Sequence, residues 1–307
     1  MTGRHFLSLL DLGRDELRAV LDQAEVLKAQ RGRPEHPRPL AGQSVALVFE
    51  KASTRTRLSF EVGVHELGGQ PLTILRRDSH LARGESLSDT ARMLSRYVHA
   101  VVYRTHAHDR VEELAASATI PVINGLTARN HPCQLLADLL TVREAFGRID
   151  GLTVAWIGDG NNMAHSWILA AAQVGLTLRV ACPVGYAPDA TIVAEARARG
   201  ARIQLTDDPR EAAAGAQVVT TDVWSSMGDE AEADQRKQAF RAYQVDGPLL
   251  GVAAADAIFL LCLPSHRGEE GTAEVTDGGA SRGWDQAENR LHTQKALLVA
   301  LMAPKAS

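Results

Sequence analysis

Short apolar runs that alternate with helical segments constrain the fold of this chain more than any other feature. SVALVF (residues 44–49) and AVVYR (100–104) are almost continuously apolar, as expected for parallel strands whose sheet is covered on both faces. The segments between such runs have helical periodicity. The first of them places apolar residues at Leu17, Val20, Leu21, Ala24 and Leu27. This alternation predicts an α/β protein with parallel sheets.

The alternation occurs twice, on either side of a glycine-bounded stretch at residues 147–151. Because domains usually contain about 100–200 residues, a chain of 307 residues predicts two of them. We expect each domain to be a parallel sheet covered by helices on both faces, with the last helix, at about residues 289–301, crossing back to the first domain. The predicted limits are 1–147 together with about 287–307 for the first domain, and 148–286 for the second. Between Arg267 and Gly283, a run rich in glycine and acidic residues predicts a mobile surface loop.

Composition narrows the function classes. A net charge of −4 gives no electrostatic reason to expect binding to nucleic acid or a membrane. Three cysteines are too few and too scattered for a disulfide framework or a CxxC metal site. The N-terminus lacks the apolar run of a signal peptide, and no stretch of about 18 apolar residues is present. We therefore expect a cytoplasmic protein without a metal or cofactor.

A strand-to-helix transition carries the first chemical signal, within LVFEKASTRTRLSFEVG (47–63). Two hydroxyl side chains, Ser53 and Thr54, are followed at once by Arg55, Thr56 and Arg57. A helix N-terminus presents unpaired N–H groups and a partial positive charge. Hydroxyl and guanidinium donors added there make a site for an anion, most naturally a phosphate. An N-cap cluster with two solvated arginines would show the same residues, so the rest of the chain has to decide.

Four further groups stand just past predicted strand ends or at helix starts, where parallel α/β sheets place their sites. Arg104 ends one strand, HPCQ (131–134) opens a helix, CLP (262–264) ends the last strand, and Arg290 stands in the final helix. Each alone has an ordinary explanation as a cap, a packed side chain or a surface charge. Together these donors and acceptors suit a phosphate beside a carbonyl and an NH2 group.

The dinucleotide-binding alternative does not fit. GDGNNMAHS (158–166) follows a strand, but Met163 stands where the third glycine of the fingerprint belongs. The next strand, LRVAC, also ends without the acidic residue expected for a ribose.

The motifs FEKASTRTRLSFEVG, HPCQLLADLLT, GDGNNMAHS, DVWSSMG and CLPSHRGEE together resemble the ornithine carbamoyltransferase family, over about residues 5–302. The resemblance implies transfer of the carbamoyl group from carbamoyl phosphate to the side-chain amine of L-ornithine, giving L-citrulline and phosphate, as in arginine biosynthesis. It also implies a homotrimer with shared active sites, in which a loop around His80 reaches the neighbouring subunit.

The resemblance also implies a set of ligand residues. Carbamoyl phosphate is expected to contact Ser53, Thr54, Arg55, Thr56, His80, Arg104, His131, Gln134, Cys262, Leu263 and Arg290. Ornithine is expected to contact Asn162, Asp222, Ser226 and Met227. Catalytic roles are expected for Arg55, Arg104, His131 and Cys262.

One position departs from the family pattern. The family usually has histidine directly before the cysteine of CLP, whereas this chain has Leu261. Leucine can fill the volume but cannot donate a hydrogen bond. This keeps open another acceptor amine, such as acetylornithine or putrescine, or a catalytically impaired regulatory homologue.

Overall fold

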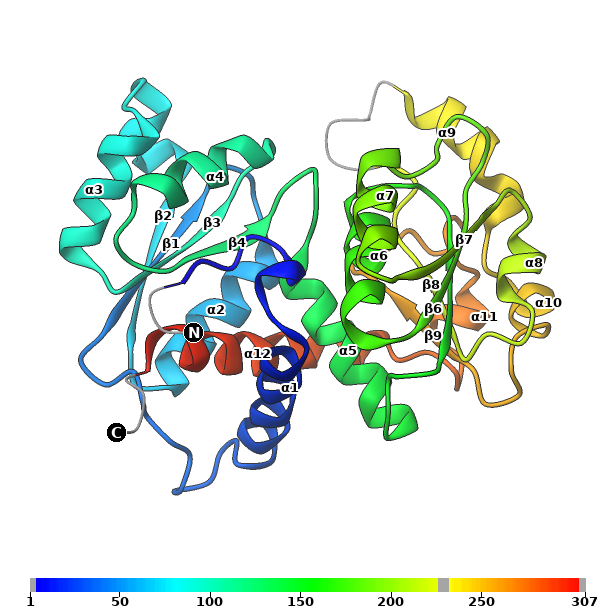
Figure 1. The fold of residues 1–307 in the computed structure, drawn as a ribbon, viewed down its shortest axis with the longest axis horizontal. Coiled ribbons are helices and arrows are strands. Elements are labelled where there is room, and N and C mark those ends of the chain that lie inside the picture. The colour runs from blue at the N-terminus through cyan, green and yellow to red at the C-terminus, as the bar shows by residue number, and fades with distance from the viewer. Residues whose placement is uncertain (1–3, 226–231, 304–307) are drawn as a thin grey trace. The chain divides into compact units, whose positions relative to one another are not determined.

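The computed structural model describes residues 4–225 and 232–303 of the chain (Figure 1). It forms two compact units: unit 1 comprises Met1–Leu140 and Glu288–Ser307, and unit 2 comprises Thr141–Ala287. Each unit contains one parallel sheet with helices around it, which confirms the predicted α/β class. The division falls inside a helix, whereas the sequence put the domain boundary at the glycines after that helix. The predicted limits at residues 147 and 286 therefore stay a prediction.

The sheet of unit 1 has four parallel strands in the order β2-β1-β3-β4. They are β1 (Ser44–Phe49), β2 (Gln70–Leu75), β3 (Ala100–Arg104) and β4 (Val122–Leu126). The two central strands are buried almost throughout, as their apolar runs predicted. The register pairs Phe49 with Arg104 at the carboxyl ends of β1 and β3. The segment after Phe49 and the side chain of Arg104 therefore meet at the same edge of the sheet.

Helices cover both faces of this sheet. Figure 1 shows α3 and α4 over one face and α1, α2 and α12 over the other. Their bounds are α1 (Arg14–Ala29), α2 (Thr54–Glu66), α3 (Leu87–Tyr97), α4 (His108–Ser117), α5 (Pro132–Phe146) and α12 (Gly283–Met302). On the first face, Leu94 and Leu114 pack in one apolar cluster with Val101. From Glu288 onward α12 belongs to unit 1, as predicted for the last helix.

The sheet of unit 2 has five parallel strands in the order β7-β6-β5-β8-β9. They are β5 (Thr153–Ile157), β6 (Thr177–Ala181), β7 (Arg202–Thr206), β8 (Val218–Thr221) and β9 (Ile258–Leu261). The order reverses beside β5, so the carboxyl ends of β5 and β8 form the switch point at which open α/β sheets bind ligands. GDGNN and Asp222 follow these two strands.

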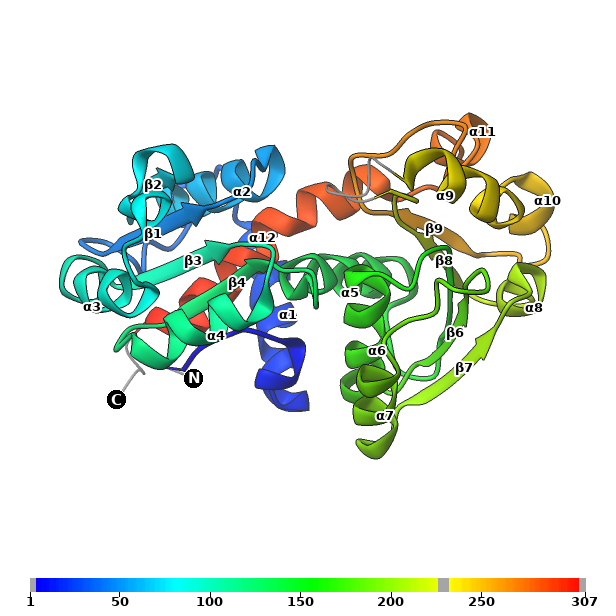
Figure 2. The same cartoon turned by 90° about the horizontal axis from the view of Figure 1, so that it is seen from above.

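Figures 1 and 2 show α6 and α7 side by side along one face of this sheet. Helices α8 and α9 contribute to an apolar cluster with the last strand of the sheet. The helices of unit 2 are α6 (Asn162–Val174), α7 (Ala190–Ala198), α8 (Pro209–Ala213), α9 (Ala233–Phe240), α10 (Gly247–Leu250) and α11 (Ala273–Thr276). Ala212 and Phe240 join Phe259 of β9 in this apolar cluster. The strands are thus covered on both sides, as in unit 1.

Two segments differ from the sequence prediction. The run predicted as a mobile loop contains α11 and buries Glu270 and Val275. The last helix begins at Gly283, earlier than the predicted start near residue 289. The first buried residue of this helix is the polar Gln286. Its side chain accepts a hydrogen bond from the backbone N–H of Leu261 (3.2 Å). An apolar periodicity therefore could not reveal this turn.

Candidate active site

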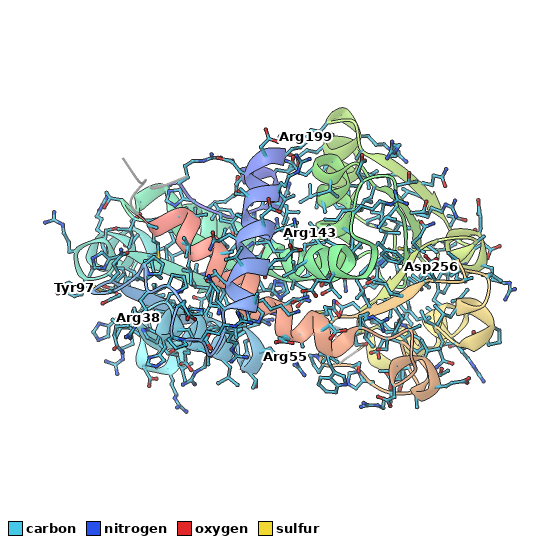
Figure 3. The ribbon with its side chains drawn as sticks, turned by 90° about the horizontal axis from the view of Figure 1, so that it is seen from below. Arg38, Arg55, Tyr97, Arg143, Arg199 and Asp256 are labelled. Atoms are coloured by element: carbon cyan, nitrogen blue, oxygen red, sulfur yellow. The ribbon has the colours of Figure 1, made fainter. Side chains whose placement is uncertain are left out.

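The N-terminus of α2 is laid out for an anion. Ser53 occupies the N-cap position in an extended conformation, and its side chain caps no amide among the described residues. Thr54 and Arg55 follow with exposed side chains, and Figure 3 labels Arg55. The first-turn N–H groups, the hydroxyls and this guanidinium can all donate hydrogen bonds to one anion. The phosphate site expected here from the sequence stays a prediction.

The approach to α2 is fixed by a carboxylate that the sequence did not single out. Glu50 accepts hydrogen bonds from Arg110 Nη2 (2.6 Å) and Thr105 Oγ1 (2.5 Å). Burial opposes ionisation of Glu50, but the bonds from Arg110 and Thr105 outweigh it and lower its pKa. Its own backbone N–H donates to the carbonyl of Arg104 (3.0 Å). The turn before Ser53 is therefore held by an ionised, bonded side chain.

Thr56 is the centre of a buried cluster. Its Oγ1 accepts from Arg104 Nη1 (3.1 Å) and from Arg290 Nη2 (2.8 Å). All three side chains are buried. A hydroxyl oxygen has two lone pairs, so these two donors use both and leave the O–H proton to be donated. The sequence prediction that Thr56, Arg104 and Arg290 share a site is consistent with these contacts.

His131 and Gln134, at the start of α5, complete this cluster. Arg290 Nη1 donates to Gln134 Oε1 (2.8 Å) and lies 3.3 Å from His131 Nε2. Because a guanidinium can only donate, Nε2 is the unprotonated nitrogen and the proton of a neutral ring sits on Nδ1. Burial, reinforced by Arg290 and Arg104, holds the pKa of His131 well below its ordinary value. His131 is therefore a neutral donor, through Nδ1–H, near pH 7.

The orientation of the Gln134 amide is set from both ends. Its Nε2 donates to Asp138 Oδ1 (2.8 Å), while its Oε1 accepts from Arg290. A carboxylate accepts and a guanidinium donates, so only one of the two amide orientations satisfies both neighbours. Asp138 lies one turn further along α5 and is fully buried. Sequence reasoning missed it, although a carboxylate four residues after Gln134 on a helix was a usable signal.

In unit 2, the turn after β5 contacts the residue after β8. Asn161 caps α6 by accepting from Met163 N (2.9 Å) and Ala164 N (3.3 Å). Its Nδ2 donates to Asp222 Oδ2 (3.0 Å). The sequence expectation named Asn162, the first residue of α6, and missed Asn161. An asparagine directly before an apolar helix is the N-cap signal that could have identified it.

Asp222 is a buried carboxylate. Burial raises its pKa to about 7, although bonds from the backbone of Val223 and from Asn161 act in the opposite direction. A cation that binds beside such a carboxylate stabilises its ionised form, because ion pairing replaces the hydration that burial has removed. The role of Asp222 toward the amino end of ornithine stays a prediction.

Other expected site residues that the structure describes are more exposed than the members of the cluster around Thr56. His80 is exposed at the start of the short helix η3 (His80–Arg83), and the contacts recorded among the described residues do not link it to Thr56. Cys262 and Leu263 follow β9 and are only partly buried. Ser226 and Met227 lie outside the described residues.

The three thiols differ in environment. Burial raises the pKa of Cys133 and of Cys182 to about 12 in each case, so both remain protonated near pH 7. Cys262 is the partly exposed thiol of the three. Leu261, directly before it, is buried in the apolar cluster around Phe259. A leucine at this position therefore serves packing.

His266, Glu269 and Glu270 are the described side chains grouped closely enough to suggest a metal site. Their oxygens already have partners: Glu269 pairs with Lys237 Nζ (2.7 Å), and Glu270 accepts from the backbone of His266 (2.8 Å). We assign no metal to them. Among the described helices, none combines the length and the apolar content needed to cross a membrane.

Comparisons with known proteins cover nearly the whole chain. Residues 4–144 match the carbamoyl-P binding domain of aspartate/ornithine carbamoyltransferase, and residues 150–301 match its Asp/Orn binding domain. The ornithine carbamoyltransferase of Carboxydothermus hydrogenoformans is 52% identical over 304 residues, covering 98% of each chain. That of a Parafrankia species is 54% identical over 307 residues, covering 98% of this chain and 97% of the relative.

Solved structures agree. The ornithine carbamoyltransferase from Pyrococcus furiosus superposes with a TM-score of 0.94 at 46% identity, covering 98% of this chain and 97% of that one. The enzyme of the same name from Thermus thermophilus gives 0.89 at 42% identity, covering 98% and 99%.

Proposed function

Since the chain belongs to the aspartate/ornithine carbamoyltransferase family, we propose that it transfers the carbamoyl group of carbamoyl phosphate to the side-chain amine of L-ornithine. The products are L-citrulline and phosphate. The observation that carries this proposal is the buried cluster in which Thr56 accepts from Arg104 and Arg290, beside His131 and Gln134. Buried cations at an open helix N-terminus suit a dianionic leaving group.

The donor half of the reaction follows from this cluster. The phosphate is held at the start of α2 by its N–H groups with Ser53, Thr54 and Arg55. We assign Thr56 O–H, the guanidinium of Arg104 and His131 Nδ1–H as the donors to the carbamoyl oxygen. Gln134 Oε1 can accept from the carbamoyl NH2 with its second lone pair. Donors already oriented toward a developing oxyanion commonly contribute about 3–4 kcal/mol each to the transition state.

The acceptor half uses unit 2. Asp222 pairs with the charged amino end of ornithine, and Asn162 supplies an amide. The resemblance adds Ser226 and Met227, and it places Cys262 and Leu263 at the carbamoyl group. The side-chain amine, with an ordinary pKa of about 10.4, must lose a proton before it attacks. Its nitrogen then bonds to the carbamoyl carbon, the carbon–oxygen bond to phosphate breaks, and the amine's second proton passes to the departing phosphate.

The alternatives receive no support from Leu261. Its side chain lies in an apolar cluster and its N–H is bonded to Gln286. This is what a packing substitution would produce. A change of acceptor, or loss of activity in a regulatory homologue, would need an altered contact in the acceptor set, and the described members Asn162 and Asp222 match the family pattern.

We further propose a cytoplasmic homotrimer that acts in arginine biosynthesis without a cofactor. Exposed apolar side chains support self-association: Leu58 and Val62 lie one turn apart on α2, and Leu72 lies on the edge strand β2. Exposed groups of this kind often mark a contact surface. The exposed His80 is free of the cluster in its own subunit, as expected if it serves a neighbouring one.

An acceptor panel tests the proposed function. Carbamoyl phosphate is supplied with L-ornithine, acetylornithine or putrescine, and carbamoylated product and phosphate are both measured. We expect the highest kcat/KM with ornithine. A higher value with another amine would replace the acceptor, and no product with any amine, despite bound ligands, would favour the regulatory homologue.

A further inference from the structure

Arg236 in α9 donates hydrogen bonds to two groups outside its own helix. Its Nε donates to the backbone carbonyl of Trp224, and its Nη2 pairs with Asp159 Oδ2. The arginine is 7% exposed. A long cation is rarely buried to this extent unless it is paired, and here both bonds reach segments that are distant in sequence.

Two aromatic rings pack against the guanidinium. Its Cζ lies 4.9 Å from the ring centroid of Tyr186 and 5.3 Å from that of Phe240. Phe240 in turn stacks with Trp224, with 6.1 Å between centroids. Contact with both rings limits the directions in which the guanidinium can point. The two hydrogen-bond partners are thus held at a fixed separation.

Global stability does not by itself explain such a pair. Taking two charges out of water costs about as much as their attraction returns, so a buried ion pair often does no better than apolar side chains of similar size. What the pair does provide is a fixed geometry between Asp159 and Trp224.

The two tethered segments are those that carry the proposed acceptor ligands. Asp159 stands in the turn that leads to Asn161 and Asn162, and Trp224 follows Asp222 by two residues. The same two segments are joined a second time by the bond from Asn161 to Asp222. The turn is also packed tightly, because a Cβ on Gly160 would lie 2.2 Å from Pro188 N.

We propose that Arg236 is a positioning residue for the acceptor amino acid. Resting on the proposed function, the inference is that Arg236 sets the spacing between Asn162 and Asp222 without touching the substrate. Lysine cannot replace it, because one ammonium on a flexible stem does not present two divergent donors to a carbonyl and a carboxylate while packing on two rings.

Three variants test this positioning role in the full-length protein. Arg236→Lys keeps the charge but loses the fork, and Asp159→Asn keeps the shape but loses the ion pair. Lys237→Gln is the matched control, since Lys237 is the next residue of α9, is exposed, and pairs with Glu269. For each variant, kcat and both KM values are measured, together with the affinity for norvaline, an ornithine mimic without the side-chain amine, in the presence of carbamoyl phosphate.

Arg236→Lys should raise the ornithine KM and weaken norvaline binding by about tenfold or more, with the carbamoyl phosphate KM changed less than about twofold. Asp159→Asn should do the same to a smaller extent, and Lys237→Gln should match the wild type. A merely structural role would lower thermal stability without separating the two KM values.

An ornithine KM within about twofold of wild type in Arg236→Lys, or equal losses for both substrates, overturns the inference. If Arg236→Lys does not fold, the same criteria are applied to Asp159→Asn. If the wild type and Lys237→Gln are active and Arg236→Lys keeps its ornithine KM, this inference is overturned and the proposed function is not. A wild type and a Lys237→Gln variant that both make no citrulline overturn the proposed function, and the inference with it.

Discussion

Asp222 shows how strongly one buried side chain can tie acceptor binding to pH. Burial raises its pKa to about 7 from the ordinary value of 3.8. Above that pH the carboxylate is ionised and can pair with an ammonium group, and below it the neutral acid cannot. Burial of Asp222 therefore makes affinity for the acceptor a function of pH near neutrality.

We expect norvaline binding, with carbamoyl phosphate present, to weaken as pH falls from 8 to 5.5. Below about pH 7 the dissociation constant should rise about tenfold per pH unit, because binding then requires release of one proton. In Asp222→Asn the affinity should be low and nearly independent of pH over the same range. Calorimetry at several pH values measures both. A wild-type affinity that is constant down to pH 5.5 would contradict the role given to Asp222.

Leu261 permits a second prediction at this scale. If leucine is a packing substitution, Leu261→His should change ornithine turnover less than about threefold and lower the melting temperature, because an imidazole would enter an apolar cluster without an assured partner. Steady-state rates at saturating ornithine and a thermal melt check this. A gain of about tenfold or more, worth about 1.4 kcal/mol in the transition state, would instead mark the natural site as impaired.

At the scale of elements, α2 separates phosphate binding from folding. Its N-terminus offers exposed Thr54 and Arg55, while Phe60 and Val64 on its other side are buried against the core. A change at Arg55 therefore removes a donor from the anion site and no packing. This separation allows a clean test of the phosphate assignment.

Arg55→Ala should lower turnover by at least about a hundredfold while the protein stays folded, as expected when an oriented cation is removed from a developing charge. Arg57→Ala is the control on the same helix, since Arg57 pairs with Glu61 (2.9 Å) instead of facing the N-terminus. It should retain activity within a few-fold. Near-normal turnover of a folded Arg55→Ala protein would exclude the helix N-terminus as the phosphate site.

The sequence predicted the helices and strands that contain long runs or periodic patterns of apolar residues. It missed short helical segments and those whose buried residues are polar. The strands at Ser44–Phe49 and Ala100–Arg104 match the predicted runs residue for residue, because burial of both faces leaves a continuous apolar signal. The start of α12 was missed because its first buried residue, Gln286, is polar. The helix α11 was missed because it is a single turn with one buried residue, Val275, which is too short to show a period. A polar residue satisfied by a distant partner gives no periodic signal.

The residues of the candidate site also differ in how far the sequence could predict them. Thr56, Arg104, His131, Gln134 and Arg290 could be grouped in advance because strand ends and helix starts converge at one sheet edge. Glu50 and Arg236 could not, because their partners are distant in sequence and they have no motif of their own. Asp138 and Asn161 had local signals, four residues after Gln134 on a helix and at an N-cap, that were not used. Positions that orient ligands become visible only when their partners are located.

At the scale of the whole molecule, the proposed trimer predicts complementation between inactive subunits. Arg55→Ala and His80→Ala should each be nearly inactive. Carrying different tags, they are co-expressed and purified through both tags. In a mixed trimer whose sites combine Arg55 of one subunit with His80 of the next, about one site in three is intact. We expect activity to return toward about a third of the wild-type value.

As a control, each variant is co-expressed with a differently tagged copy of itself and purified in the same way. These oligomers should stay inactive. Mixed oligomers without activity would show that His80 does not serve a neighbouring subunit. A monomeric mass in solution would exclude the shared site altogether.

The bond from Arg290 to Thr56 joins residues 234 positions apart in sequence. During translation at about 5–20 residues per second, the ribosome needs roughly 10–50 seconds to travel between them. All of unit 2 is synthesised in that interval. A nascent chain can therefore form the sheet of unit 1 long before the cluster around Thr56 is complete, and a message truncated ahead of α12 would yield a protein without that cluster. Synthesis of α12 is thus the step that allows the site to form, since the cation cluster exists only in a chain that has been translated past Arg290.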